Sequence, residues 1–249
     1  MTILTAADFA DTGQWRLLLE IGQQGLRAFL ENTLHPEIEL QPLCSAEWDF
    51  DKDKLKQKIE DAVYNNPRLL DDFATRIILY DPRTLFIPTE IAEQSTGSEE
   101  EIYKKVYAAD DADIMTDFDR DITAAWSLAP GVKSFLMRTF PGARISSNLM
   151  EKVRTLRKNN KELTIFTFAR DGEADIILLE GSNLISASTH EWANFDDIAY
   201  MVVNLLDVYG YKLPEVKIQT EGIETDSAAW QYILSSTLNL KPSTLNPQL

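Results

Sequence analysis

The chain has 249 residues, of which 44% are hydrophobic and 10% aromatic, so it can bury a substantial core within one large or two modest domains. The 40 acidic side chains outnumber the 24 basic ones and leave a formal charge of −16, which disfavours nucleic acid and anionic membrane surfaces as partners. The single cysteine, Cys44, excludes an internal disulfide, and the lack of a signal peptide or of an apolar run of about 18 residues predicts a cytoplasmic protein without a membrane span.

The first half of the chain follows the pattern strand, strand, strand, helix, strand. Residues 1–13 are expected to form a loose arm. Apolar and β-branched runs predict four strands, over residues 15–21, 26–30, 37–45 and 76–80. The spacing of Leu55, Ile59 and Val63 predicts a helix that ends before Pro67. Residues 85–88 are expected to extend this first sheet at an edge, because Pro88 has no N–H to donate to a ladder.

A region of different character separates the two halves. Its patterns predict a strand over residues 122–126 and helices over residues 98–108, 132–140 and 149–156. Residues 110–121 are rich in aspartate: Asp110, Asp111, Asp113, Asp117, Asp119 and Asp121. Carboxylates can hold Mg²⁺ or Ca²⁺, but the residue spacing of a calcium-binding loop is missing. We therefore interpret the segment as a solvated acidic loop and expect no metal.

The second half repeats the order strand, strand, strand, helix, strand. Its strands are predicted over residues 165–169, 176–179, 184–188 and 216–219, and Asp171-Gly172 marks a tight hairpin turn. Asn194 is the expected N-cap of the helix that precedes Pro214. The tail, residues 241–249, is rich in Pro, Ser and Asn and is expected to be disordered.

The repeated element order suggests an internal duplication. Glu47-Trp48 precedes the helix of the first half, and Glu191-Trp192 precedes that of the second, an offset of 192 − 48 = 144 residues. Two independent meanders of a common type would produce the same order, so that alternative stays open.

Familiar catalytic motifs are missing from the sequence. The two histidines, His35 and His190, are far apart in sequence, and with a single cysteine they do not make a zinc site. His190 as a general base is less favoured than a hydrogen-bonded structural role. The sequence contains neither a glycine-rich phosphate loop nor a nucleophile elbow, and the five tryptophans are dispersed as core residues would be.

The doubled order of three antiparallel strands, a helix and a strand resembles the actin, sugar kinase and heat-shock chaperone superfamily. The whole chain also resembles a Bacteroidetes family of unknown function with that fold, on the basis of residues 17–25 (LLLEIGQQG), residues 86–90 (FIPTE) and the hairpin at Asp171-Gly172. The resemblance implies an α/β fold of two ribonuclease-H-like domains in tandem, each with a mixed five-stranded sheet flanked by helices. The domains would cover residues 14–145 and 146–240, with a crossover helix over residues 146–160.

Superfamily members clasp ATP between their domains, and the matching positions can be compared one by one. In the first phosphate hairpin, Glu20 replaces the metal-linked Asp, Gly22 is kept, and Gln23 and Gln24 replace hydroxyl residues. In the second, Phe168 stands where the water-orienting Asp is expected, and Arg170 replaces a glycine. In the adenosine motif, Glu221 replaces a glycine and Gly222 is kept. The resemblance therefore implies a vestigial nucleotide site, made of Glu20, Gly22, Gln23, Phe168, Arg170, Asp171, Gly172, Glu221 and Gly222.

These departures oppose ATP chemistry. Arg170 and Glu221 bring bulk where glycines let the backbone approach phosphates, and Phe168 cannot orient a water. We expect no bound cofactor and no catalytic residue, and we interpret the chain as a non-catalytic scaffold that binds a protein partner of unknown identity. The alternative is an active ATPase or phosphotransferase that uses ATP with Mg²⁺. A homodimer stays open.

Overall fold

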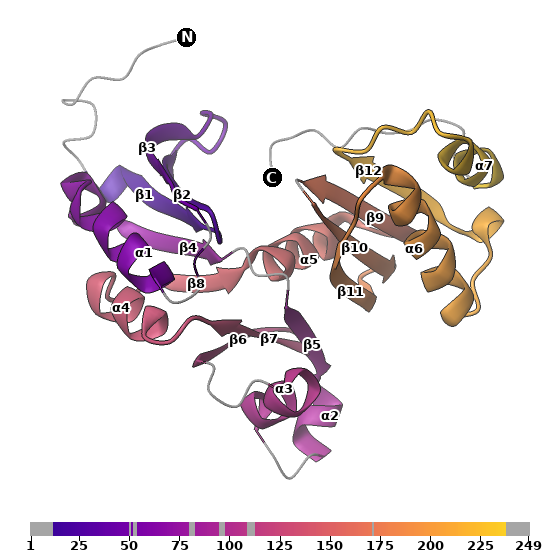
Figure 1. Ribbon diagram of the computed structural model, residues 1–249, viewed down its shortest axis with the longest axis horizontal. Helices are drawn as coiled ribbons and strands as arrows, with labels where there is room; N and C mark the ends of the chain where they lie inside the picture. Colours follow the sequence, from indigo (N-terminus) through magenta and orange to yellow (C-terminus); the bar gives the residue numbers. More distant parts are fainter. Residues whose placement is uncertain are drawn as a thin grey trace. The chain divides into compact units, whose positions relative to one another are not determined.

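The computed structural model describes residues 12–49, 51, 54–79, 83–94, 98–108, 113–170 and 172–237 (Figure 1). The predicted tail and nearly all of the predicted N-terminal arm lie outside these residues. The chain divides into two compact units. The first comprises residues 1–81 and 87–148, and the second comprises residues 82–86 and 149–249. None of the helices in the described part of the chain is long and apolar enough to cross a membrane.

A five-stranded mixed sheet is the centre of the first unit. After a short 3-10 helix, η2 (Thr12–Gln14), its strands are β1 (Trp15–Ile21), β2 (Gly25–Asn32), β3 (Gln41–Glu47), β4 (Ala74–Leu79) and β8 (Arg144–Ser147). The order across the sheet is β3-β2-β1-β4-β8. The first three strands are antiparallel neighbours, whereas β1, β4 and β8 run parallel. Because β1 is buried on both faces, its run Leu17-Leu18-Leu19 needs no polar alternation.

Helices supply the other half of this core: α1 (Leu55–Tyr64), the 3-10 helix η4 (Pro67–Leu70) and α4 (Val132–Thr139). Helix α1 buries Ile59, Ala62 and Val63, as the sequence spacing predicts, and α4 buries Val132, Phe135 and Leu136. Tyr64 of α1 meets Phe135 of α4 edge-on, with ring centroids 6.0 Å apart.

The region between β4 and α4 forms a separate three-stranded sheet. Its strands are β5 (Thr84–Pro88), β6 (Asp113–Asp119) and β7 (Ile122–Leu128), in the order β5-β7-β6. Helices α2 (Thr89–Gln94) and α3 (Glu99–Tyr107) lie between β5 and β6 in the chain, and Tyr103 of α3 is fully buried.

Three expectations for the first sheet and for the region between β4 and α4 were wrong. Within the predicted acidic loop, the residues from Asp113 to Asp119 form strand β6, which pairs antiparallel with β7 along its whole length and buries Ile114; Asp110 and Asp111 lie outside the described residues. Strand β5 belongs to the three-stranded sheet and does not extend the first one. The third strand begins at Gln41, four residues later than predicted, and Ile38 before it is 41% exposed.

The second unit has a four-stranded sheet between two helical layers. Its strands are β9 (Leu163–Arg170), β10 (Glu173–Glu180), β11 (Asn183–Glu191) and β12 (Lys217–Glu221), in the order β11-β10-β9-β12. The helices are α5 (Asn148–Asn159), α6 (Phe195–Val208), the 3-10 helix η5 (Leu213–Glu215) and α7 (Ala228–Ser236). The expectation of five strands holds for the first sheet, whereas here the chain passes from β12 into α7, and no further described strand pairs with β12.

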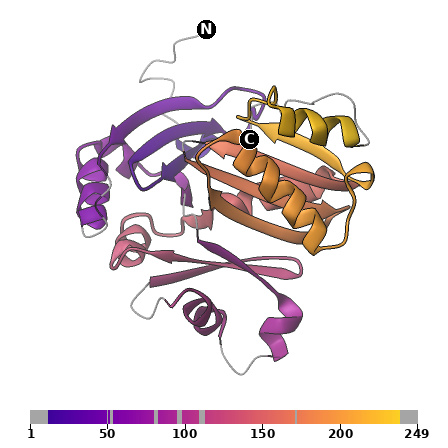
Figure 2. The same ribbon diagram turned by 45° about the vertical axis from the view of Figure 1, so that its right-hand side comes forward.

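The two faces of the second sheet carry different partners. One face, with Ile165, Ile176 and Leu178, packs against α6 and α7 in a single hydrophobic cluster (Figure 2). The other face carries Phe168 and Asp175 and receives Lys152 from α5. Helix α6 starts where the sequence predicts, because Asn194 and Asp197 form a reciprocal capping box.

Both units share a topology and a detail. Each has three antiparallel strands, a helix and a parallel strand in the same spatial order. The pairing of the second and third strands is interrupted in both, between Ala28 and Phe29 in the first unit and between Leu178 and Leu179 in the second. These shared features support the predicted duplication.

Candidate functional site

The hairpin between β1 and β2 contains the first group of predicted site residues. Gly22 N donates a hydrogen bond to Gly25 O at 2.9 Å, which closes the turn, and Gln23 is exposed. Glu20 is paired with Arg27 on the return strand at 2.9 Å. Trp48 clamps the loop from behind, since its indole nitrogen donates to Gln23 O at 2.8 Å. The turn is thus held by its own chain, and its acidic side chain already has a cation.

The hairpin between β9 and β10 is held in the same way. Trp192 donates its backbone N–H to Gly172 O at 3.1 Å and its indole N–H to Arg170 O at 3.2 Å. Gly172 has a φ of 72°, which permits the tight turn. Asp171 lies outside the described residues. In each unit, the backbone of the first hairpin therefore accepts hydrogen bonds from a tryptophan.

A buried carboxylate, Asp175 on β10, is the centre of a charge cluster beside this hairpin. Its side chain is fully buried and accepts hydrogen bonds from Lys152 Nζ at 2.8 Å and from Thr189 Oγ1 at 2.6 Å. Arg170 donates to it at 3.2 Å and also bonds Glu173 at 3.0 Å. Two cations thus face two carboxylates, and the cluster offers no net positive charge to a phosphate.

Phe168 fills the position where the resemblance places a water-orienting carboxylate. It is 4% exposed, and Lys152 Nζ lies 4.2 Å from the centre of its ring. In the sheet it lies between Asp175 on β10 and Glu221 on β12. The structure therefore puts a hydrophobic ring under a lysine at this position, with no hydrogen-bonding atom of its own to hold a water.

Gly222, at the end of β12, is required by the packing of the second unit. Its φ is 70°, and a Cβ atom there would lie 2.4 Å from Ala169 O. The glycine that matches the adenosine motif thus has a structural reason to be present, whether or not a nucleotide binds.

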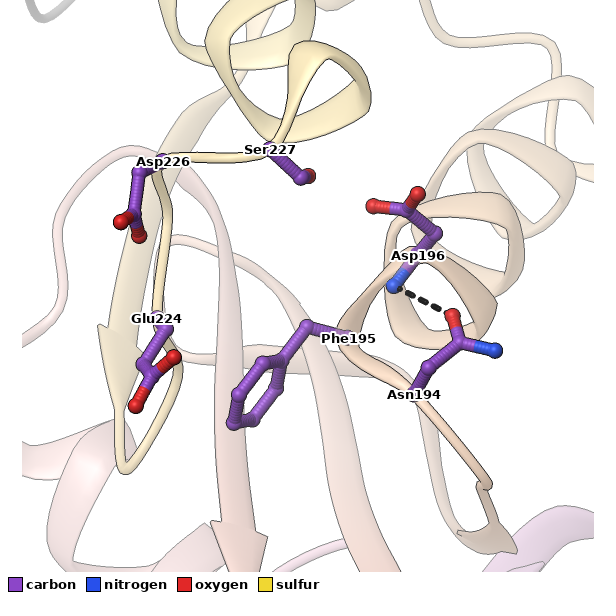
Figure 3. A pocket seen from close by; sticks show the side chains of 6 residues that line it. All are labelled: Asn194, Phe195, Asp196, Glu224, Asp226 and Ser227. Carbon is purple, nitrogen blue, oxygen red and sulfur yellow. Dashed lines mark hydrogen bonds between the residues drawn. The ribbon is translucent and has the colours of Figure 1, made fainter.

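A shallow pocket of about 450 Å³ lies at the N-terminal ends of α6 and α7 (Figure 3). Phe195 points into it from the first turn of α6, and Glu224 and Asp226 come from the loop after β12. Trp230 of α7 fixes the wall by donating to Phe195 O at 2.8 Å. With Asp196 as a third carboxylate, the pocket is acidic and repels polyanions.

Around either histidine, as elsewhere among the described residues, there is no cluster of three or more His, Cys, Asp or Glu side chains that could hold a metal ion. His190 Nε2 lies 2.7 Å from Ser188 Oγ. Burial lowers the pKa of His190 below its ordinary value, and the nearby Asp175 carboxylate opposes that effect.

Comparison with known proteins identifies the chain at the level of a family. A family model described as "Protein of unknown function (DUF3822)" matches residues 5–234. The chain belongs to the DUF3822 family. The search of curated proteins found no match to it.

Solved structures establish the fold of this DUF3822 protein. A Bacteroides thetaiotaomicron protein with an actin-like ATPase fold and unknown function is 17% identical, with a TM-score of 0.76 over 97% of this chain and 94% of that one. The actin-like fold and the resemblance to a Bacteroidetes family are thereby confirmed. More distant structures are the PilM–PilN type IV pilus biogenesis complex (9% identity, TM-score 0.47, 89% of this chain and 85% of that one covered) and the Aquifex aeolicus Ppx/GppA phosphatase (8% identity, TM-score 0.40, 84% and 67% covered).

Within the DUF3822 chain, the structure gathers some of the predicted site residues and adds others. The second unit brings together Phe168 and Arg170 of β9 and Glu221 of β12, which are adjacent strands, with Gly172 in the turn after β9 and Gly222 directly after β12. In the first unit, one hairpin contains Glu20, Gly22 and Gln23. The sequence reasoning missed Lys152, Asp175 and Thr189. One signal was available, because Asp175 interrupts an otherwise apolar strand, and a buried carboxylate needs a partner.

Proposed function

We propose that this protein is a non-catalytic member of the actin-like fold that binds a protein partner and does not hydrolyse ATP. The observation that carries the proposal is the charge-balanced cluster around Phe168. A nucleotide phosphate would find a phenyl ring under Lys152 and an arginine already engaged by Glu173 and Asp175. Neither group resembles the polar cradle that positions the phosphates and stabilises their charge in phosphoryl transfer.

The outward faces of α6 and α7 support a protein-binding role. Tyr200 on α6 is 72% exposed and Tyr232 on α7 is 67% exposed, although both helices pack their inner faces on the sheet. Neither helix contains a lysine or an arginine, whereas α6 contains three aspartates. An apolar surface with only negative charge fits a partner segment that combines basic and apolar residues.

Turnover tests the first part of the proposal. Purified protein is incubated with Mg-ATP, and phosphate release and thermal unfolding are followed, with an active sugar kinase as positive control. We expect no release above the buffer rate and no shift in Tm beyond the one that inorganic phosphate alone gives. Magnesium-dependent hydrolysis that disappears in Glu20→Gln would contradict the proposal and favour an active ATPase.

Matched tyrosine substitutions test the binding surface. A partner that co-purifies with the protein is isolated, and its affinity is measured for the wild type, Tyr200→Ser and Tyr232→Ser. Because buried interface tyrosines often contribute about 2 kcal/mol, each substitution should weaken binding by roughly tenfold or more, and added salt should weaken it further. Tyr64→Ser, which changes a tyrosine 57% exposed on α1, is the control and should bind as the wild type does. An acidic partner, or equal affinity for all variants, would overturn this surface.

A further inference from the structure

A second pocket, of about 290 Å³, lies in the first unit at the amino-terminal ends of three parallel strands. Three of its lining residues are arginines: Arg16 near the start of β1, Arg76 on β4 and Arg144 at the start of β8. None of the described residues that line it is an Asp or a Glu. In a protein with a charge of −16, this is a basic site within an acidic surface.

The strand register explains why the arginines converge. Arg76 is the direct neighbour of Arg144 in the parallel pairing of β4 with β8. Arg16 is the neighbour of Ala74, two residues before Arg76, and residues two apart share one face of a strand. All three side chains therefore leave the sheet on the same face. Phe73, which is 8% exposed, adds an apolar wall.

Placing cations side by side costs free energy unless anions compensate them. Arg16 is bonded to Glu31 on β2 at 3.3 Å, and both side chains are partly exposed, so this pair is weak. Arg76 and Arg144 also interact with other groups of the protein. Such contacts orient the guanidinium groups. Each guanidinium has five N–H donors, so a group held by one contact can still donate to an anion in the pocket.

We propose that this pocket binds the oxyanion group of a small ligand, a phosphate or a carboxylate. The planar guanidinium donates two parallel hydrogen bonds to either group, which a lysine cannot do. The pocket is at the lower limit of the roughly 300–1,000 Å³ typical of small-molecule sites, so the ligand is small. Arg16 precedes the end of β1 by five residues, about 16 Å along the strand, so this site is distinct from the hairpin that matches the phosphate loop.

Calorimetric titration with inorganic phosphate and, separately, with citrate tests the proposal and distinguishes the two sources of the oxyanion. Sodium chloride keeps the ionic strength constant, so that non-specific screening cancels. We expect saturable binding of at least one anion. In Arg144→Gln the affinity should fall about tenfold, because one charge-assisted contact is lost. Arg144→Lys should recover only part of the lost affinity, since lysine restores the charge but not the two parallel hydrogen bonds of a guanidinium.

Arg138→Gln is the matched control, since Arg138 is an exposed arginine of α4 outside the pocket. It should bind as the wild type does. Arg16→Gln serves as a second pocket variant if thermal unfolding shows that Arg144→Gln is not folded. Absence of saturable binding for both anions, or equal affinity in the wild type and both pocket variants, would overturn the proposal. Nucleotide turnover and partner binding are measured separately, so the outcome of the anion titration neither supports nor contradicts the proposed function.

Discussion

At the scale of single residues, Asp175 is a buried carboxylate whose unfavourable burial is compensated by hydrogen bonds within the second unit. A fully buried carboxylate is unfavourable unless it is paired and hydrogen-bonded. Here Lys152, Arg170 and Thr189 all donate to it. The same contacts occupy the cations that a phosphate would need, so stability and the loss of a nucleotide site have a common cause in our proposal.

Gly222 allows a sharp test of backbone geometry. Gly222→Ala should destabilise the protein by about 1–3 kcal/mol from the positive φ alone, and by more because the new Cβ would meet Ala169 O. Gly210→Ala is the control, since Gly210 has a φ of 74° with no atom within 4 Å of the added Cβ. Urea denaturation should rank Gly222→Ala well below Gly210→Ala. Equal midpoints would show that the backbone at Ala169 yields to the added Cβ at no cost in free energy.

His190 gives a pH prediction of definite sign. Its pKa in the folded protein is lowered by burial, from an ordinary value of 6.5 that it regains on unfolding. The unfolded chain therefore binds more protons than the folded one between these two values, and stability falls as the pH decreases through that window. Denaturation midpoints at pH 7.5 and pH 5.5 should drop more for the wild type than for His190→Gln. A variant that loses as much as the wild type would disprove the link.

At the scale of elements, the tryptophan clamp occurs in both units. Trp48 and Trp192 each follow the third strand and bond the carbonyls of the first hairpin through the indole and the backbone nitrogen. Trp48→Phe and Trp192→Phe should each cost about 1 kcal/mol, because each removes one hydrogen bond and keeps an aromatic ring. Chemical denaturation measures the cost. Faster amide exchange at residues 48 and 192 would locate it, and unchanged stability in both variants would refute the clamp.

Local patterns predicted most elements of the sheets and helices, and their failures have physical reasons. Hairpin turns, the Asn194 cap and the apolar stripe of α1 each depend on residues close together in the sequence, so the sequence predicts them. Strand β8 was missed because Arg144–Ser147 is short and polar, and its identity depends on pairing with β4. Strand β6 was missed because three of its seven residues are aspartates, and its identity depends on pairing with β7.

At the scale of the whole molecule, the net charge of −16 predicts a response to salt. Between about 10 and 150 mM NaCl the Debye length falls from about 30 to 8 Å, so repulsion among the excess carboxylates is screened. Tm should therefore rise, by about 2–4 °C for each kcal/mol of repulsion relieved. Sodium chloride is chosen because chloride lacks the oxyanion geometry of the arginine pocket. A Tm that falls over this range would indicate that attractive ion pairs outweigh the repulsion.

The amino-acid sequence already contained the doubled order of elements, the excess of acidic residues and the hairpin turns, because these depend on neighbouring residues and on composition. Long-range contacts were out of its reach. Lys152 meets Asp175 across 23 residues, and Arg16 lies in one pocket with Arg144 across 128. Such contacts depend on strand register and on which helix covers which face of a sheet. Local sequence patterns predict neither.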